Sequence, residues 1–381
     1  MRERIRNKLQ ALAAILTFLL LAAGYASLSL TREESETDAL FSGLSQDSPL
    51  FVDAVAGLSG EAEAIVLYDA LTDTVLYAHG GDKRLPMAST TKIMTATVAL
   101  ERGDPDAAFT IPESVCGVEG SSIYLRAGEV LTLRELLYGL MLESGNDAAE
   151  AVAVCVGGTK ENFVSMMNEK AEQLGFSSTH FDNPHGLSSE THYTTAKELA
   201  ALSAYALRNE TFRKIVSTKS YTIPERENCA ARYFSNHNRL LRSLPNCTGV
   251  KTGYTAASGR CLVTSAETDG GRFVAVTLND RRDFSDHKVL LNYAAEQYTT
   301  LCAAKESELS LPIKVPAFSE KALFAVNDVP LCVTVPKDFS APLSVTVKID
   351  RAALKKGGEN AVSAVVRAGD YTVRYTLACG E

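Results

Sequence analysis

Apolar and polar residues follow strand-like and helix-like patterns in separate blocks of this 381-residue chain. Residues 61–80 carry two apolar runs, rich in Val, Leu and Tyr, on either side of LTDT, and this pattern predicts a β-hairpin. From about Ala88 to Gly175 the chain predicts a block of helices, interrupted by AFTIPESVCGVEGSSIYLRAGEV, with apolar residues at spacings of three and four. Its clearest segments are TLRELLYGLMLES, DAAEAVAVCVGG and ENFVSMMNEKAEQLG. A further helix is expected over TTAKELAALSAYALRN.

Strand patterns return from Thr248 onward. GVKTGYT, RCLVTSAET and RFVAVTLND predict three strands, and FSDHKVLLNYAAEQYTT predicts a helix that ends near Leu301. Because strands and helices form separate groups rather than a regular alternation, the pattern predicts an α+β fold.

The last part of the chain has a different pattern. Its short β-branched runs, separated by Pro, Gly and Asp, predict a small all-β domain: LCVTVPKDF, PLSVTVKID, AVSAVVRAG and YTVRYTLACG. We therefore expect one domain over residues 59–305 and a β-rich domain over 306–381, with a polar linker over 31–58 before them.

The first 30 residues have the features of an export signal. Four basic residues up to Lys8 precede an apolar stretch from Leu9 to Leu30, and small residues near Ala26 resemble a cleavage site. The pattern favours a signal peptide over an uncleaved anchor, although the stretch matches the roughly 20 residues that span a bilayer. Both alternatives place the remaining chain outside the cytoplasmic membrane, with membrane contact only through this segment.

Composition and charge exclude other classes of protein. The net charge of -8 and the pI near 5.5 provide no general attraction for nucleic acid. Eight scattered cysteines without a C-x-x-C motif argue against a zinc site. Cys155 and Cys261 lie in apolar runs and are expected to be small buried residues, while Cys229 and Cys247 are a candidate disulfide.

A group of histidines also resembles a metal site at first sight. His180, Asp182, His185 and His192 are close in sequence, but the proline and glycine between them break any helical register that would align them. We expect no metal and no cofactor. His237 is expected to be a hydrogen-bonded packing residue, so a Ser-His-Asp triad has no support.

Ser89 and Lys92 are spaced i and i+3 at the start of a predicted helix, so the amine can reach the hydroxyl. The pattern alone is weak, because Ser285 and Lys288 have the same spacing. Two further motifs, each present once, distinguish the first pair: Ser-Gly-Asn at 144–146 and Lys-Thr-Gly at 251–253. The order S-x-x-K, S-x-N, K-T-G is that of penicillin-binding proteins and class A β-lactamases.

Longer stretches point to one family. SGNDAAEAVA, FDNPHGLSSETHYTTAKELA, NHNRLL and GVKTGYTAASGRCLVTSA resemble the exported D-alanyl-D-alanine carboxypeptidases, the low-molecular-mass penicillin-binding proteins, from about Ala62 to Tyr298. The resemblance implies a sheet flanked by helices, with the site between the helical cluster and an edge strand. It also implies hydrolysis of peptidoglycan stem peptides that end in D-Ala-D-Ala, inhibition by β-lactams, and a location at the outer face of the cell membrane or in the cell wall.

The resemblance, together with the chemistry of the side chains, assigns the catalytic roles. Ser89 is expected to attack the carbonyl of the penultimate D-alanine and form an acyl-enzyme. Lys92 has to be neutral to accept the serine proton, and burial and the nearby cation of Lys251 both favour the neutral amine. Ser144 is expected to pass protons between the two lysines and the leaving amine, and Asn146 to bind the substrate amide.

The third motif suits substrate binding. Lys251 and Thr252 are expected to hold the free carboxylate of the terminal D-alanine, assisted by Arg281 or Arg282. Gly253 lets the substrate backbone lie against the strand. The backbone N–H groups of Ser89 and Tyr254 are the expected oxyanion hole.

Two other functions are alternatives. A class A β-lactamase uses a glutamate downstream of the second motif, but the corresponding segment, QLGFSSTHFDNPHGL, has none. A non-catalytic wall scaffold or sensor would be expected to have lost Ser89, Lys92 or Lys251, and all three are present.

Overall fold

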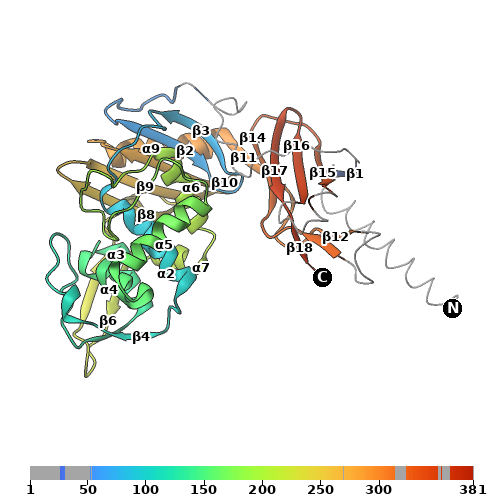
Figure 1. Cartoon of the computed structure of the whole chain (residues 1–381). Helices are drawn as coiled ribbons and strands as arrows, with labels where there is room; N and C mark the ends of the chain where they lie inside the picture. The colour runs from blue at the N-terminus through green and yellow to red at the C-terminus, as the bar shows by residue number, and fades with distance from the viewer. Residues whose placement is uncertain are drawn as a thin grey trace, which may run out of the picture. The chain divides into compact units, whose positions relative to one another are not determined.

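The structure is a computed structural model that describes residues 26–30, 52, 54–268, 270–313, 323–350, 353 and 361–380. The chain divides into two compact units, one within Gly43–Gln297 and one formed by Tyr298–Glu381 with the residues before Gly43 (Figure 1). Each unit is described by itself. Most of the predicted export signal and linker lies outside the described residues, apart from strand β1 (Ala26–Leu30) and a few positions between 52 and 58.

A five-stranded antiparallel sheet forms the centre of the first unit, in the order β3-β2-β10-β9-β8. Its strands are β2 (Ala64–Asp69), β3 (Thr74–His79), β8 (Cys247–Thr255), β9 (Gly259–Thr268) and β10 (Gly271–Leu278). The predicted hairpin is confirmed as β2 and β3, and the three predicted later strands are β8 to β10. The K-T-G motif lies on β8, which is an edge strand of this sheet.

Side chains from both faces of the sheet are buried. Ala64, Val66 and Tyr68 of β2 belong to the large apolar core that includes the helices, while the alternating Ile65 and Leu67 are equally buried but lie outside that core. Because successive strand residues point to opposite faces, both faces must be covered. Helix α9 (Asp283–Gln297) packs on β9, β10 and β2, and α6 (Ala196–Ala206) packs on β10 and β2.

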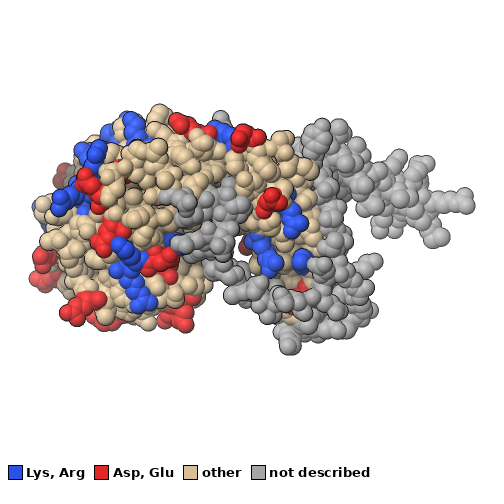
Figure 2. All heavy atoms as spheres, turned by 90° about the horizontal axis from the view of Figure 1, so that it is seen from above, with Lys and Arg blue, Asp and Glu red and all other residues tan. Residues whose placement is uncertain are grey.

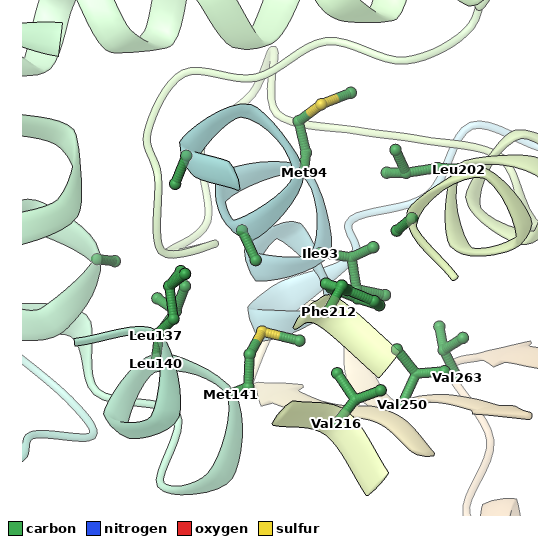
Figure 3. Packing of buried hydrophobic residues seen from close by; sticks show 14 of the residues in the cluster. Ile93, Met94, Leu137, Leu140, Met141, Leu202, Phe212, Val216, Val250 and Val263 are labelled. Carbon is green, nitrogen blue, oxygen red and sulfur yellow. The ribbon is translucent and has the colours of Figure 1, made fainter. Parts of the chain in front are cut away.

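Most of the other helices gather around α2 (Lys92–Arg102), which follows the short 3₁₀ turn η1 (Ala88–Thr91). They are α3 (Leu133–Leu142), α4 (Asn146–Gly157), α5 (Lys160–Gln173) and α7 (Glu210–Ser217). Helix α8 (Leu240–Ser243) instead contacts β8, and a second 3₁₀ turn, η2 (Glu113–Val115), contacts α4. Figure 3 shows Ile93 of α2 beside Phe212 of α7, within the buried apolar cluster to which Leu137 of α3 and Val263 of β9 also belong. This apolar contact fixes the start of α2 against the sheet.

Several short elements were not predicted. Two two-stranded sheets, β4 (Ala108–Thr110) with β5 (Val130–Thr132) and β6 (Ser220–Ile223) with β7 (Arg232–Ser235), have strands too short for a clear period-two pattern. The last predicted helix ends at Gln297 rather than near Leu301, because the next residues form β11 (Tyr298–Ala304).

The second unit is built from strands, as predicted for the β-rich tail. Strand β11 pairs with β14 (Leu331–Pro336). A three-stranded sheet contains β12 (Ser310–Ile313), β13 (Leu323–Val326) and β18 (Ala378–Gly380). A four-stranded sheet contains β1, β15 (Leu343–Ile349), β16 (Val362–Ala368) and β17 (Tyr371–Thr376).

The prediction of a Cys229–Cys247 disulfide is wrong. Both cysteines are free, and the disulfide joins Cys302 to Cys332, which lie directly opposite each other on β11 and β14. Cys261 is buried as expected, but Cys155 is only partly buried. Sequence spacing alone did not reveal the register that brings the bonded pair together.

Charged side chains are mixed on the surface of the described residues. On the face drawn in Figure 2, Lys and Arg are interspersed with Asp and Glu rather than gathered into one large patch. Within the described ranges, no helix is both long and apolar enough to cross a bilayer.

Candidate active site

The turn that carries Ser89 contains a residue in an uncommon backbone conformation, Ala88, and is held by hydrogen bonds that lead to a buried histidine. Ala88 has a positive φ of 47°, which is uncommon for a residue with a side chain. Its carbonyl accepts a hydrogen bond from Thr91 Oγ1 at 2.8 Å, and Thr91 Oγ1 lies 2.7 Å from His192 Nε2. Since His192 Nδ1 accepts the Asp182 N–H at 3.0 Å, the ring proton sits on Nε2 and is donated to Thr91. Burial lowers the pKa of His192 to about 4, so this chain of hydrogen bonds uses a neutral ring.

Lys92 is completely buried at the first position of α2. Its Nζ lies 2.9 Å from Ser89 Oγ, 2.7 Å from Asn146 Oδ1 and 2.7 Å from the carbonyl oxygen of His185. Burial first, and then the charge of Lys251, hold the pKa of Lys92 well below its usual range, although Asp147 acts in the opposite direction.

The three contacts of Lys92 suit a neutral amine. A neutral amine has two N–H donors and one lone pair, and two of its partners, the amide oxygen and the carbonyl oxygen, can only accept. The lone pair is then left for the Ser89 hydroxyl, which can donate its proton. This arrangement gives the amine the geometry of a general base for Ser89.

Asn146 is fixed by contacts at both ends of its side-chain amide. Its Nδ2 donates to the carbonyl oxygen of Glu119 at 2.6 Å, which turns Oδ1 toward Lys92. The space is tight, since an added methyl group on Gly120 would lie 2.7 Å from Nδ2. The structure therefore shows Asn146 positioning Lys92, a contact that the sequence analysis did not predict. Its binding of the substrate amide stays a prediction.

Asp147 is a further residue that the sequence analysis missed. Its buried carboxylate accepts hydrogen bonds from Ser122 Oγ at 2.6 Å and from the backbone N–H groups of Ile123 and Leu125 at 3.0 Å. These bonds hold the loop before β5 beside the start of α4. The available signal was an acidic residue directly after the S-x-N motif at a helix N-terminus, where acids are favoured.

Ser144 is buried and has a φ of 63°, in the left-handed region. Among the described residues, no hydrogen bond joins its side chain to Lys92 or to Lys251. Its role as a proton relay stays a prediction.

Lys251 is buried on β8, and only 1% of it is exposed. Its Nζ donates to the carbonyl oxygen of Thr252 at 2.8 Å. Burial lowers the pKa of Lys251 to about 7, opposed by Glu143. The group therefore loses its charge near neutral pH in the free protein, and a bound carboxylate would favour the charged form.

Gly253 brings β8 directly against the turn that carries the serine. An added methyl group there would lie 3.1 Å from Ser89 N and 3.2 Å from the carbonyl oxygen of Met87. The absent side chain thus makes room for the protein's own backbone. Tyr254, the next residue, has 68% of its surface exposed. Ser89 N therefore lies beside the residue that precedes Tyr254, while the oxyanion hole and substrate binding along Thr252 and Gly253 stay predictions.

The loop FDNPHGL closes the other side of the turn. The carbonyl oxygen of His185 accepts a hydrogen bond from Lys92. The ring Nε2 of His185 lies 3.1 Å from Glu150 Oε1. His180 instead pairs with Asp182 at 3.3 Å and His192 with Thr91, so the three histidines have separate partners. These contacts make the loop a structural part of the site. His237 Nε2 lies 3.3 Å from Glu143 Oε2, but the residue is exposed, so the prediction that it is a packing residue is wrong.

Substitution of Gly186 tests how much the turn at Ala88 depends on the FDNPHGL loop. Gly186 has a φ of +93°, and an added methyl group would lie 1.9 Å from the carbonyl oxygen of Ala88. We expect Gly186→Ala to lower the free energy of unfolding by at least about 2 kcal/mol, measured by denaturant unfolding, and to slow penicillin labelling.

Gly158→Ala is the matched control. Gly158 also has a positive φ, of +77°, but nothing lies within 4 Å of the added methyl group, so only the backbone strain of about 1–2 kcal/mol is expected. Equal losses in the two variants would show that the contact with Ala88 is unimportant.

Arg281 and Arg282 lie together at the start of α9, in a hollow with Arg239 and Arg260. No described contact links either residue to Lys251 or Thr252, so their help with the substrate carboxylate stays a prediction.

Comparison with known proteins identifies the family. Residues 52–282 match Peptidase_S11, described as D-alanyl-D-alanine carboxypeptidase. D-alanyl-D-alanine carboxypeptidase DacF of Bacillus subtilis is 32% identical over 326 residues, covering 79% of this chain and 83% of the relative.

Two solved structures agree with this assignment. Penicillin-binding protein 5 from Haemophilus influenzae matches with a TM-score of 0.66 and 26% identity, covering 84% of this chain and 98% of that chain. The Streptomyces K15 DD-transpeptidase matches with a TM-score of 0.58 and 34% identity, covering 61% and 96%. The chain therefore belongs to the D-alanyl-D-alanine carboxypeptidase family of serine peptidases, the low-molecular-mass penicillin-binding proteins.

Proposed function

We propose that this protein removes the terminal D-alanine from peptidoglycan stem pentapeptides through an acyl-enzyme on Ser89, and that β-lactams acylate the same serine. The observation that carries the proposal is the buried Lys92 amine, 2.9 Å from Ser89 Oγ and held by two groups that can only accept hydrogen bonds. The domain at 59–305 would perform this reaction, outside the cytoplasmic membrane. The domain at 306–381 would position it, and the N-terminal segment would provide any membrane contact.

The first half of the reaction forms the acyl-enzyme. Ser89 Oγ attacks the carbonyl carbon of the penultimate D-alanine, and the hydroxyl proton passes to Lys92 Nζ. The oxyanion is stabilised by the N–H groups of Ser89 and Tyr254. The peptide bond then breaks, and the proton that Lys92 accepted passes through Ser144 to the leaving amine, which leaves Lys92 neutral again.

The second half releases the product. Free D-alanine departs, a water molecule attacks the ester carbonyl, and Lys92 accepts a proton from that water. The shortened stem peptide leaves and Ser89 regains its proton. Lys251 and Thr252 hold the terminal carboxylate before cleavage, so the reaction requires a substrate with a free C-terminus.

The direct test measures peptide cleavage and penicillin labelling, and identifies the labelled peptide. The purified full chain should release D-alanine from diacetyl-lysyl-D-alanyl-D-alanine, and fluorescent penicillin should label it covalently on the tryptic peptide that contains Ser89. Label without D-alanine release would favour the scaffold or sensor. Rapid loss of the label with hydrolysed penicillin as product would favour a β-lactamase.

The pH dependence of kcat/KM tests whether the reaction needs a charged Lys251 and a neutral Lys92. Since the pKa of Lys251 is lowered to about 7, the cation that holds the carboxylate is present below that pH and is lost above it. We expect kcat/KM for the peptide to fall as the pH rises above about 7, and to fall again at low pH as Lys92 gains a proton.

Lys251→Arg is the control for the alkaline limb. An arginine keeps its charge throughout this range, so the fall above pH 7 should disappear in this variant even if the overall rate is lower. An unchanged alkaline limb would assign that fall to another group.

A further inference from the structure

Four arginines from three separate segments surround one hollow in the first unit. Arg239 precedes α8, Arg260 lies on β9, and Arg281 and Arg282 join β10 to α9. The hollow has a volume of about 440 Å³. This volume lies within the roughly 300–1,000 Å³ typical of sites for small ligands. Its lining includes Arg281 and Arg282, the candidates for assisting with the substrate carboxylate, but not Ser89, Lys92, Ser144 or Lys251.

The positive charge of this hollow is mostly uncompensated. Asp283, its one carboxylate, forms a bidentate pair with Arg260 at 3.0 and 3.1 Å. Among the described residues, Arg239, Arg281 and Arg282 have no ion pair. Arg281 and Arg282 also stand at the N-terminal end of α9, where the helix dipole repels cations. A cluster of this kind, in a chain of net charge -8, is stabilised when an anion binds.

An aromatic ring holds part of the cluster in place. The guanidinium carbon of Arg239 lies 4.4 Å from the ring centroid of Phe284, and that of Arg260 lies 5.7 Å from it. Such stacking orients the guanidinium plane and leaves its N–H groups for other partners. The donors of Arg239 are thus oriented before any ligand arrives, which lowers the entropy cost of binding.

The size and charge of the hollow distinguish between kinds of anion. One carboxylate is satisfied by a single bidentate guanidinium, as the Arg260–Asp283 pair shows. Three further guanidinium groups match an anion with more oxygen atoms and more than one charge, and arginine forks fit phosphate oxygens in this way.

We propose that this arginine hollow binds a phosphate-bearing ligand. The hollow adjoins the substrate strand, because Arg260 pairs with Tyr254 across β9 and β8. A bound phosphate group would therefore hold the protein on a phosphate-bearing surface or molecule with its active site close by. This inference does not depend on the proposed peptidase activity.

Inorganic pyrophosphate is the first probe. Isothermal titration of the full chain at low salt should show binding that weakens as salt is added. Arg239→Gln should weaken it by about tenfold, since one charge-assisted contact is lost, while Arg239→Lys should retain part of it. Arg102→Gln removes an exposed arginine from the end of α2 and is the matched control, expected to bind as the unmodified protein does.

A second measurement identifies the source of the phosphate. Vesicles of phosphatidylglycerol are compared with vesicles of phosphatidylcholine in co-sedimentation. Phosphatidylglycerol binding that depends on Arg239 and is displaced by pyrophosphate would assign a lipid headgroup. If pyrophosphate binding depends on Arg239 but vesicle binding does not, the ligand of the hollow would be assigned as a soluble phosphate compound.

The result that overturns the proposal is also clear. Absence of pyrophosphate binding at low salt, or equal affinity in Arg239→Gln and the unmodified protein, would show that the hollow is not a phosphate site. The melting temperature and D-alanine release of Arg239→Gln should match those of the unmodified protein, which separates a binding defect from a folding defect.

Discussion

Ser89→Ala is expected to lower D-alanine release by on the order of 10⁴-fold or more and to abolish covalent penicillin labelling. The variant removes the oxygen that forms the ester, and no other group at the site replaces it. The alanine keeps the backbone of η1, so the melting temperature should stay close to that of the unmodified protein. Release is measured with the diacetyl tripeptide and labelling by in-gel fluorescence.

The chain contains its own control for this variant. Ser285 stands three residues before Lys288 with the same spacing, but its Oγ donates to the carbonyl oxygen of Arg282 at 2.7 Å rather than contacting a buried amine. Ser285→Ala should leave labelling and release unchanged. Persistent label in Ser89→Ala, or its loss in Ser285→Ala, would contradict the assignment of the nucleophile.

Lys92→Met is expected to slow acylation by about 10²–10⁴-fold, the usual contribution of a general base. Methionine has a similar length but no amine, so Ser89 loses its proton acceptor while the apolar part of the side chain is kept. The rate of penicillin labelling under single-turnover conditions measures this step directly.

A loss of stability has to be separated from this loss of catalysis. Without the amine, Asn146 Oδ1 and the His185 carbonyl lose a buried donor, which costs about 1–3 kcal/mol for each unsatisfied group. Labelling is therefore compared at a temperature where denaturant unfolding shows the variant to be folded. Lys288→Met, at an exposed position with the same spacing from a serine, should have no effect. Acylation of Lys92→Met at the unmodified rate would remove Lys92 from the mechanism.

Much of the fold could be predicted because the long elements have strong periodic patterns. Strands β2 and β3 and helices α3, α4 and α5 occur where the pattern placed them. The two-stranded sheets β4–β5 and β6–β7 could not be predicted, because strands of three or four residues carry too little periodicity. The disulfide depended on the register of β11 and β14, which only the three-dimensional pairing reveals.

The candidate site was predictable in part for a similar reason. Ser89, Lys92 and Lys251 fall in short motifs whose order is informative, and the structure brings Ser89 and Lys92 into contact. The contacts around them were not visible in the sequence. Three contacts join groups that are far apart in the chain: Asn146 with Lys92, the Asp147 carboxylate with the N–H of Ile123, and the His185 carbonyl with Lys92. A backbone carbonyl has no sequence signal at all.

The turn at Ala88 touches Gly253 of β8 and Gly186 of the FDNPHGL loop, segments that are distant along the chain. The serine can thus become reactive only after all of these pieces have come together. We therefore expect an unfolded or incompletely folded chain not to react with β-lactams. The fraction of chains that become acylated then measures the fraction that is correctly folded.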